Sequence, residues 1–399
     1  MANLQFVLFD GEERQSLLPF TYTRAIADIR IGILKIHEKW NLALNTTCDV
    51  FAHQYLQLKY PFTAKSDAVF INASVLPDEN IVDNILSLQP GNALTAENGK
   101  VIAIRPEQNI STLNHLYMLG KTIQKQVYKQ KYTALQFPWD IFTYNGTQIQ
   151  SDIKLMKLEP NGHLLEKDNK ILHPENIYVE EGVSAVWSML NASNGPIYLG
   201  KDSEVMEGAI IKGNFALCEH SSVKMGAKIY GDTTIGPHSK VGGEIGNSVI
   251  FGYSNKGHDG YLGNSVLGEW CNLGADTNNS NLKNNYSTVK AWSYPAAKEV
   301  STGLQFCGLM MGDHSKCGIN TMFNTGTVVG VSANIYGGGF PPKFIPSFSW
   351  GGSDGMVPYE FEKAVATVRR VMERRSMTLS DTDQQILWQV YEDSSIFRK

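Results

Sequence analysis

The chain has 399 residues, which is enough for two or three domains. With 42% hydrophobic residues, 19% charged residues and a net charge of −4, its composition is typical of a globular protein and argues against a disordered chain or a nucleic-acid partner. No apolar run approaches the roughly 18 residues of a membrane span, so no membrane partner is expected. The five cysteines are odd in number and form no CxxC pair, which favours a reducing cytoplasm over a disulfide framework or a zinc cluster.

The N-terminal region alternates strand-like and helix-like segments. Strands are predicted at 4–9, 68–72 and 101–104, and helices at 31–40 and 113–125. This alternation predicts an α/β domain over residues 1–175, with a parallel sheet and flanking helices. The loop after the first strand is expected at the carboxyl end of a central strand, where ligands bind in such sheets.

An internal repeat dominates the middle of the chain, because eight aliphatic residues follow one another at intervals of six. They are Leu199, Val205, Ile211, Leu217, Val223, Ile229, Ile235 and Val241. Successive anchors on an α-helix would be rotated by about 240° and scattered, whereas a strand keeps them on one face. The frame resumes at Val249 and Tyr261 and returns at Met311. We therefore predict a β-helix over residues 176–345; a β-sandwich with coincidental spacing is the alternative.

Two segments depart from the repeat. The hexads stop over residues 275–303, and this insertion, with Trp292 and Tyr294, is a candidate intersubunit arm. Residues 346–399 show helical spacing and are predicted to form two helices that cover the open end of the β-helix. Their arginines, which are interpreted as a solvated face or as ligands for a cofactor phosphate, are Arg369, Arg370, Arg374 and Arg375.

Polar residues concentrate on neighbouring coils of the repeat, in the segments 255–263, 272–275 and 281–283. Fourteen positions separate His258 from Asn272, less than one coil of about 18 residues, so both are expected at one edge of the prism. A histidine titrates near pH 6.5 and accepts a proton from an attacking amine or hydroxyl. Carboxamides bind sugar hydroxyls, and lysines bind phosphates. The same side chains are also common as ordinary turn residues, and Tyr261 falls in the inward frame.

The repeat resembles the hexapeptide-repeat family, which forms left-handed β-helices with three hexads per coil. The polar segments resemble the acetyltransferase half of the bifunctional glucosamine-1-phosphate acetyltransferase and N-acetylglucosamine-1-phosphate uridylyltransferase family. The residues that match its spacing are His258, Tyr261, Gly263, Asn272, Gly274, Ala275 and Asn281.

This resemblance implies a role for each matched position. His258 is implied as the general base, Tyr261, Asn272 and Asn281 as sugar-binding residues, and the Ala275 backbone as a neighbour of the acetyl thioester of acetyl-CoA. Asp276 stands where the family usually has glycine. The chain has no arginine between Arg105 and Arg369, so the residues that would replace the family's phosphate-binding arginine are Lys256, Lys283 or Lys212.

The N-terminal part resembles sugar nucleotidyltransferases through the segments 18–24, 28–32, 38–40 and 138–142. The resemblance implies a nucleotide site after the first strand, and the candidates are Gly11, Arg14 and Arg24. Better-known members have a glycine-rich loop there, whereas this chain has Glu12 and Glu13, which are unfavourable beside a triphosphate unless Mg²⁺ or arginines compensate. The expected metal-binding aspartate is replaced by Asn72.

Three hypotheses follow. The first is acetyl-CoA-dependent acyl transfer to a sugar phosphate or nucleotide sugar, with His258 as base and a degenerate N-terminal domain. The second is sugar-1-phosphate nucleotidyl transfer from UTP or dTTP at the N-terminal domain, and the third is a non-catalytic trimer that binds nucleotide sugars. A homotrimer is implied by the resemblance, because acyl-CoA then lies between neighbouring prisms.

Overall fold

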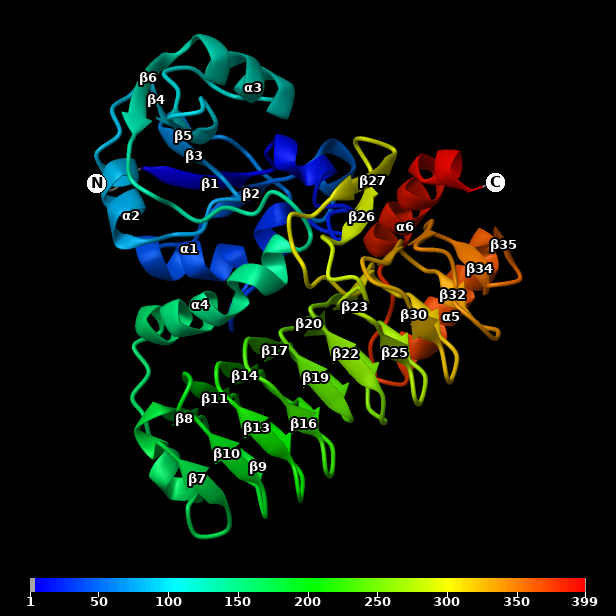
Figure 1. Cartoon of the computed structure of the whole chain (residues 1–399). Helices are drawn as coiled ribbons and strands as arrows, with labels where there is room; N and C mark the ends of the chain where they lie inside the picture. Colours follow the sequence, from blue (N-terminus) through cyan, green and yellow to red (C-terminus); the bar gives the residue numbers. More distant parts are fainter. Residues whose placement is uncertain (1–3, 399) are drawn as a thin grey trace. The chain divides into compact units, whose positions relative to one another are not determined.

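The computed structural model describes residues 4–398 of the chain, which divides into two compact units (Figure 1). The first unit comprises Met1–Leu17, Thr23–Ile29 and Leu34–Phe137; the second comprises Leu18–Tyr22, Arg30–Ile33 and Pro138–Lys399. The domain boundaries at 175/176 and 345/346 stay predictions.

A six-stranded sheet in the order β2-β1-β3-β5-β4-β6 forms the centre of the first unit. Its strands are β1 (Gln5–Phe9), β2 (Asp49–Phe51), β3 (Ala68–Asn72), β4 (Asn92–Ala96), β5 (Val101–Arg105) and β6 (Gln124–Tyr128). Its helices are α1 (Ile36–Leu44), α2 (Glu79–Leu86) and α3 (Leu113–Thr122). Strand β5 runs antiparallel to both its neighbours because it forms a hairpin with β4, and the other pairs are parallel. The predicted α/β class is confirmed, with one strand reversed.

Two helices of the first unit have bounds that differ from those predicted from the sequence. Helix α1 begins five residues later than predicted, and α3 ends at Thr122 instead of residue 125. The backbone turns extended at Ile123, and the following residues pair with β4 as strand β6. Sheet pairing therefore overrides the helical pattern there.

Three parallel sheets of the second unit form the sides of a β-helix (Figure 1). We call them the open, covered and pocket faces. The open face contains β7 (Lys170–Leu172), β10 (Met189–Asn191), β13 (Ile210–Lys212), β16 (Lys228–Ile229), β19 (Glu244–Gly246) and β22 (Tyr261–Gly263). The covered face contains β8 (Ile177–Val179), β11 (Ile197–Leu199), β14 (Phe215–Leu217), β17 (Thr233–Ile235), β20 (Val249–Gly252), β23 (Val266–Glu269), β28 (Met310–Met311), β31 (Val328–Val329) and β33 (Phe344–Ile345). The pocket face contains β9 (Ser184–Ala185), β12 (Glu204–Val205), β15 (Ser222–Val223), β18 (Lys240–Val241), β21 (Asn255–Lys256), β24 (Asn272–Leu273), β29 (Lys316–Cys317), β32 (Asn334–Ile335), β34 (Ser349–Gly352) and an antiparallel final strand, β35 (Gly355–Pro358).

The coil length follows from the strand register. Leu199 pairs with Leu217, and Leu217 with Ile235, so one coil takes 18 residues, or three hexads. All eight predicted anchors are at most 3% exposed and belong to one continuous apolar core. The β-helix predicted from the repeat is confirmed, as is the left-handed form implied by the family resemblance.

The inward positions predicted for Val249 and Tyr261, where the six-residue spacing was expected to resume, are wrong. Ile235 pairs with Ile250, so that coil is 15 residues long, and Ile250 takes the inward position in place of Val249. Likewise Leu262 points inward, whereas Tyr261 stays half-exposed on the open face. The coil loses half a hexad, which shifts the expected inward residues by one position.

Helix α4 (Asp140–Leu155) and the N-terminal segments of the second unit pack on the covered face. The ring centroids of Phe20 and Phe251 lie 5.2 Å apart, and Arg30 Nε donates to the Phe251 carbonyl at 3.2 Å. Asn145 of α4 is fully buried and bonds both Gly32 and Thr234. The covered face of the β-helix is therefore shielded from solvent by these segments.

The insertion forms a hairpin of β26 (Lys290–Ser293) and β27 (Lys298–Ser301), preceded by β25 (Asn278–Asn279), which pairs with β30 (Met322–Phe323). Trp292 stacks on Phe344 at 4.0 Å, and Tyr294 meets Phe397 edge-on at 5.3 Å. Both rings are thus packed against their own chain, and the intersubunit role of the insertion stays a prediction.

The two helices predicted for the tail are α5 (Phe361–Glu373) and α6 (Asp381–Asp393). Phe348, near the last coils, contacts both Phe361 and Tyr391. Beyond the end of α5, Arg375 donates to the His238 carbonyl at 3.0 Å and to Asn255 Oδ1 at 3.2 Å. Arg375 is therefore bound to the β-helix and is not part of a freely solvated face.

Candidate functional site

A cavity of about 790 Å³ lies on the pocket face of the β-helix. Strand residues of that face, one turn beyond them and the end of α5 form its wall. The lining residues are Lys224, Lys240, Tyr253, Asn255, Gly257, His258, Trp270, Cys271, Asn272, Gly274, Ala275, Lys316, Ile319, Val371, Arg374 and Arg375. Three residues predicted from spacing, His258, Asn272 and Ala275, are thus brought together in one cavity.

His258 lies in the four-residue turn 257–260 that leads from β21 to the open face. Its side chain is exposed, as is that of Asn272 on the adjacent strand β24. Asn255 and Asn272 are paired residues of neighbouring strands, so their side chains lie side by side on the pocket face. An imidazole beside two carboxamides can accept a proton while amide groups hold a polar substrate.

The cavity is strongly cationic. Lys224, Lys240, Lys316, Arg374 and Arg375 line it, and its lining contains no carboxylate. Burial lowers the pKa of Lys316 to about 8, and its ammonium donates to the His314 carbonyl at 2.8 Å. Because the β-helix contains no arginine, the guanidinium groups of this cavity come from Arg374 and Arg375 of the C-terminal tail. This concentration of positive charge suits a polyanionic ligand.

A stack of rings borders the cavity along one edge of the β-helix. His220, His238, Tyr253 and Trp270 follow one another with centroids 4.8, 4.8 and 4.4 Å apart and interplanar angles of 16° or less. All four residues adopt positive φ at the same corner of successive coils. Sequence reasoning missed this stack, although its spacing of 18, 15 and 17 residues matches the coil length.

Other predicted residues lie elsewhere. Tyr261 and Asn281 meet at the open face, where Asn281 Nδ2 donates to the tyrosine hydroxyl at 3.0 Å. Lys283 donates to the Thr288 carbonyl in the insertion. Lys256 is 1% exposed, and its ammonium bonds carbonyls of the His258 turn, so the structure does not bring it to the cavity as a substrate ligand.

A second cavity of about 410 Å³ lies in the first unit, at the carboxyl ends of β1 and β3. Gly11 and Asn72 line it, as do the lysines at 100, 121 and 125. Glu13 forms an ion pair with Lys100 at 2.9 Å and accepts a hydrogen bond from Asn72 Nδ2 at 3.2 Å. A Cβ on residue 11 would lie 2.1 Å from the Glu13 carboxylate and 2.8 Å from the Asn72 amide, so a larger residue there would require these side chains to move.

The two predicted nucleotide-binding arginines do not line this cavity. Arg14 is 5% exposed; its Nη2 donates to the Tyr55 hydroxyl at 2.6 Å, and its Nε lies 3.8 Å from Asp10. Arg24 is 3% exposed. Lysine side chains therefore supply the positive charge at the cavity, with Gly11 as the predicted residue that does reach it.

Of the carboxylates at this edge, Glu12 lines the cavity, whereas Asp10 and Glu13 are held in contacts within the protein. Asp10 is enclosed, and its two carboxylate oxygens accept backbone N–H bonds from Ile26 and His53, each at 2.8 Å. Asn72 donates to Glu13, which is itself paired with Lys100. Within residues 4–398, no three His, Cys, Asp or Glu side chains come together as a metal site. A Mg²⁺ that enters with a nucleotide would be held by the phosphates and one or two protein carboxylates, and Glu12 in the cavity wall is the candidate for such a ligand.

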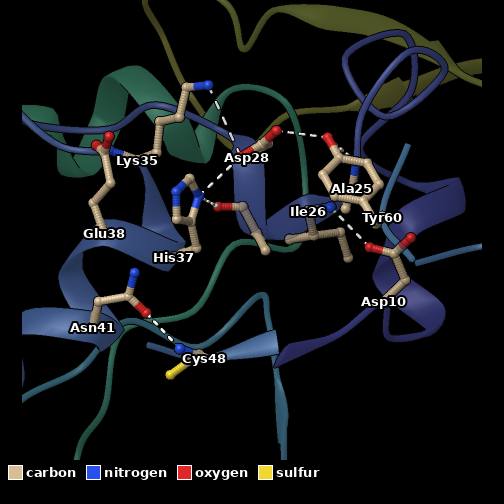
Figure 2. Close-up of polar contacts among 11 residues, drawn as sticks. Asp10, Ala25, Ile26, Asp28, Lys35, His37, Glu38, Asn41, Cys48 and Tyr60 are labelled. Carbon is tan, nitrogen blue, oxygen red and sulfur yellow. Dashed lines mark hydrogen bonds and ion pairs between the residues drawn. The ribbon is translucent and has the colours of Figure 1, made fainter. Parts of the chain in front are cut away.

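A buried polar network stabilises the segment before α1 (Figure 2). Asp28 accepts a hydrogen bond from Tyr60 at 2.6 Å and lies 2.8 Å from His37 Nδ1 and 3.9 Å from Lys35. Although burial alone acts in the opposite direction, the contact with His37 and the charge of Lys35 hold the pKa of Asp28 well below its usual range. Against the effect of burial, Asp28 raises the pKa of His37. This network is structural, since no cavity adjoins it among those described above.

Within the described residues, none of the helices is both long enough and apolar enough to cross a membrane.

The N-terminal part of the chain is similar to a known protein family. Residues 6–160 match the family model described as sugar nucleotidyl transferase. The predicted family resemblance is confirmed.

Curated relatives combine such a domain with a second activity in their names. The chain is 28% identical over 225 residues to the bifunctional sugar-1-phosphate nucleotidylyltransferase/acetyltransferase of Sulfurisphaera tokodaii, covering 50% of this chain and 55% of that protein. It is 25% identical over 279 residues to the bifunctional protein GlmU of Methanococcus maripaludis, covering 70% of this chain and 58% of that protein. The chain thus spans little more than half the length of these relatives.

Among solved structures, an Arabidopsis UDP-N-acetylglucosamine acyltransferase matches with 15% identity and a TM-score of 0.22, over 58% of this chain and 90% of that one. The polySia specific acetyltransferase NeuO matches with 15% identity and a TM-score of 0.26, over 46% and 87%.

Proposed function

We propose that this chain transfers an acetyl group from acetyl-CoA to an amine or hydroxyl of a sugar phosphate or nucleotide sugar. The observation that carries the proposal is the cavity of the β-helix, where His258, Asn272 and Ala275 lie together in a lining with five cationic side chains. The name of the Sulfurisphaera tokodaii relative, which includes acetyltransferase, agrees with this chemistry.

In the proposed reaction, His258 accepts the proton of the acceptor amine or hydroxyl as its nitrogen or oxygen attacks the thioester carbonyl. The tetrahedral oxyanion is stabilised by the backbone N–H of Ala275, and Asn272 orients the sugar. The carbon–sulfur bond then breaks, and the departing CoA thiolate takes up the proton held by the imidazole. Arg374 and Arg375 complement the phosphates of the donor.

The test measures thiol release from acetyl-CoA with glucosamine-1-phosphate and a panel of nucleotide sugars. His258→Ala is expected to lower turnover by about 10²- to 10⁴-fold while the melting temperature is kept, because an exposed turn residue contributes little packing. The matched control is His163→Ala, another exposed histidine, which lies outside both the cavity lining and the ring stack. Equal turnover of the His258 variant and the wild type would remove His258 from the mechanism.

A homotrimer is part of the proposal. The open face carries exposed apolar side chains in successive strands or just beyond them, at Leu172, Met189, Ile210 and Tyr230, and such a face is suited to burial against another copy. Light scattering is expected to give about three times the 44.3 kDa of one chain. An active monomer would contradict this part. The five cysteines are all free and buried, which agrees with a reducing cytoplasm.

The second candidate function belongs to the first unit, where the lysine-lined cavity favours binding of a nucleotide sugar. Nucleotidyl transfer is expected to be weak, since the Glu13 carboxylate occupies the space beside Gly11 where the backbone would otherwise approach the phosphates. The assay follows pyrophosphate release from UTP or dTTP with a sugar 1-phosphate and Mg²⁺. Turnover of several per second, lost in Lys100→Ala, would make this site the principal activity.

A further inference from the structure

Lys256 occupies a position that is otherwise apolar. The inward residues of the pocket face form one column, in which Lys256 follows Val241 and precedes Leu273, and Cys317 and Ile335 come later. Each of these residues is at most 5% exposed. A lysine costs free energy at such a position unless its ammonium is hydrogen-bonded.

The ammonium of Lys256 is bonded to the turn that carries His258. Nζ donates to the His258 carbonyl at 2.6 Å and to the Asp259 carbonyl at 2.9 Å. Burial lowers the pKa of this lysine to about 8, so it still carries a proton at neutral pH. The side chain thus reaches from inside the β-helix to the backbone of two consecutive turn residues.

This turn differs from those of the other coils at the same edge. In the four-residue turns 206–209, 224–227 and 274–277 the third residue adopts positive φ, at +72° in Gly208, +68° in Gly226 and +57° in Asp276. In the turn 257–260, positive φ occurs instead at the fourth residue, Gly260, at +110°. The regular turns 206–209 and 274–277 are closed by backbone hydrogen bonds of 3.3 and 3.2 Å between their fourth and first residues. The irregular turn is held from within by Lys256.

We propose that Lys256 is a positioning residue that fixes the irregular turn 257–260 and thereby presents His258 to the cavity. The inference rests on the proposed acyl transfer, because that reaction gives His258 its role. Misplacement of a reacting group by about 1 Å is enough to lower a rate by about 10²-fold, so two hydrogen bonds at the base of the turn matter for turnover.

Two variants test the assignment. Lys256→Met fills the column with an apolar side chain, and Lys256→Gln keeps a polar group that is too short to span both carbonyls. Ile335→Met is the matched control, since it places methionine in the same column two coils beyond Leu273. Each protein is checked for its melting temperature, acetyl transfer, and hydrogen exchange in a peptide that covers the turn.

Either folded Lys256 variant is expected to lower kcat by about 10²-fold with the KM for acetyl-CoA within about threefold, and to exchange faster only in the turn. The control is expected to match the wild type. Wild-type exchange and wild-type kcat in a folded Lys256 variant would overturn the assignment, as would failure of both variants to fold, which would make Lys256 a folding residue.

The exchange measurement separates this inference from the proposed function. If the wild type transfers no acetyl group to any acceptor while the turn of Lys256→Met exchanges faster, the positioning role is supported and the proposed function fails. If the wild type is active and the variant loses neither protection nor turnover, the proposed function stands and the positioning role fails.

Discussion

Replacement of Asn145 by alanine is expected to destabilise the second unit strongly. The amide of this fully buried residue accepts from Gly32 N–H at 2.7 Å and donates to the Asp232 carbonyl at 2.9 Å and to Thr234 Oγ1 at 3.0 Å. Thr234 keeps another partner, because its hydroxyl also donates to the Gly32 carbonyl at 2.9 Å. The substitution therefore leaves two buried backbone groups without a partner.

An unsatisfied buried group costs about 1–3 kcal/mol, so the expected loss in the free energy of unfolding is about 2–6 kcal/mol. For a unit of this size, 1 kcal/mol corresponds to about 2–4 °C, so the melting transition of the second unit is expected to fall by about 4–24 °C. Differential scanning calorimetry is suitable, because it separates the transitions of two units.

Gln150→Ala is the matched control on the same helix. Its side chain is exposed, and its amide makes a 2.9 Å hydrogen bond to Asn214, so a loss below about 0.5 kcal/mol is expected. A melting temperature of Asn145→Ala within about 2 °C of the wild type would refute the reasoning, as would equal effects of the two substitutions.

Three further predictions concern other regions. Arg375→Ala is expected to raise the KM for acetyl-CoA by about tenfold with a smaller change in kcat, because a charged hydrogen bond to a phosphate contributes about 1.5–3 kcal/mol; steady-state kinetics that show an unchanged KM would contradict this. His37→Ala is expected to lower the free energy of unfolding by about 1–3 kcal/mol at pH 6 and by less at pH 9 in urea titrations, since contact with Asp28 raises the pKa of His37 and this stabilisation is lost as pH rises through that pKa. An effect that grows with pH would show that the sign is wrong. Trp292→Ala, which removes the stack on Phe344, is expected to lower the melting temperature without changing the mass found by light scattering; a change to monomers would support the intersubunit arm.

The sequence was sufficient to predict the β-helix, because its cause is local and repeated. An aliphatic residue at every sixth position needs only a strand at each side of a coil to become buried, as residues 199–241 show. The same logic placed His258 and Asn272 at one edge, because 14 residues are less than one coil, whereas Ala275 was implied by the family resemblance. One coil is only 15 residues long, so the six-residue spacing no longer predicts which residues point inward after it. For this reason Tyr261 was predicted to point inward, whereas the structure has Leu262 there.

Tertiary structure alone decided which distant groups join the site. No sequence spacing relates Arg375 of the tail to the carbonyl of His238, since the contact depends on where α5 ends against the β-helix. The sequence pattern also did not predict that the Lys256 side chain is buried, because a lysine near a catalytic motif is ordinarily assigned to the surface. Its burial follows from strand alternation in β21, which turns Asn255 outward and leaves Lys256 to find its hydrogen-bond partners inside the prism.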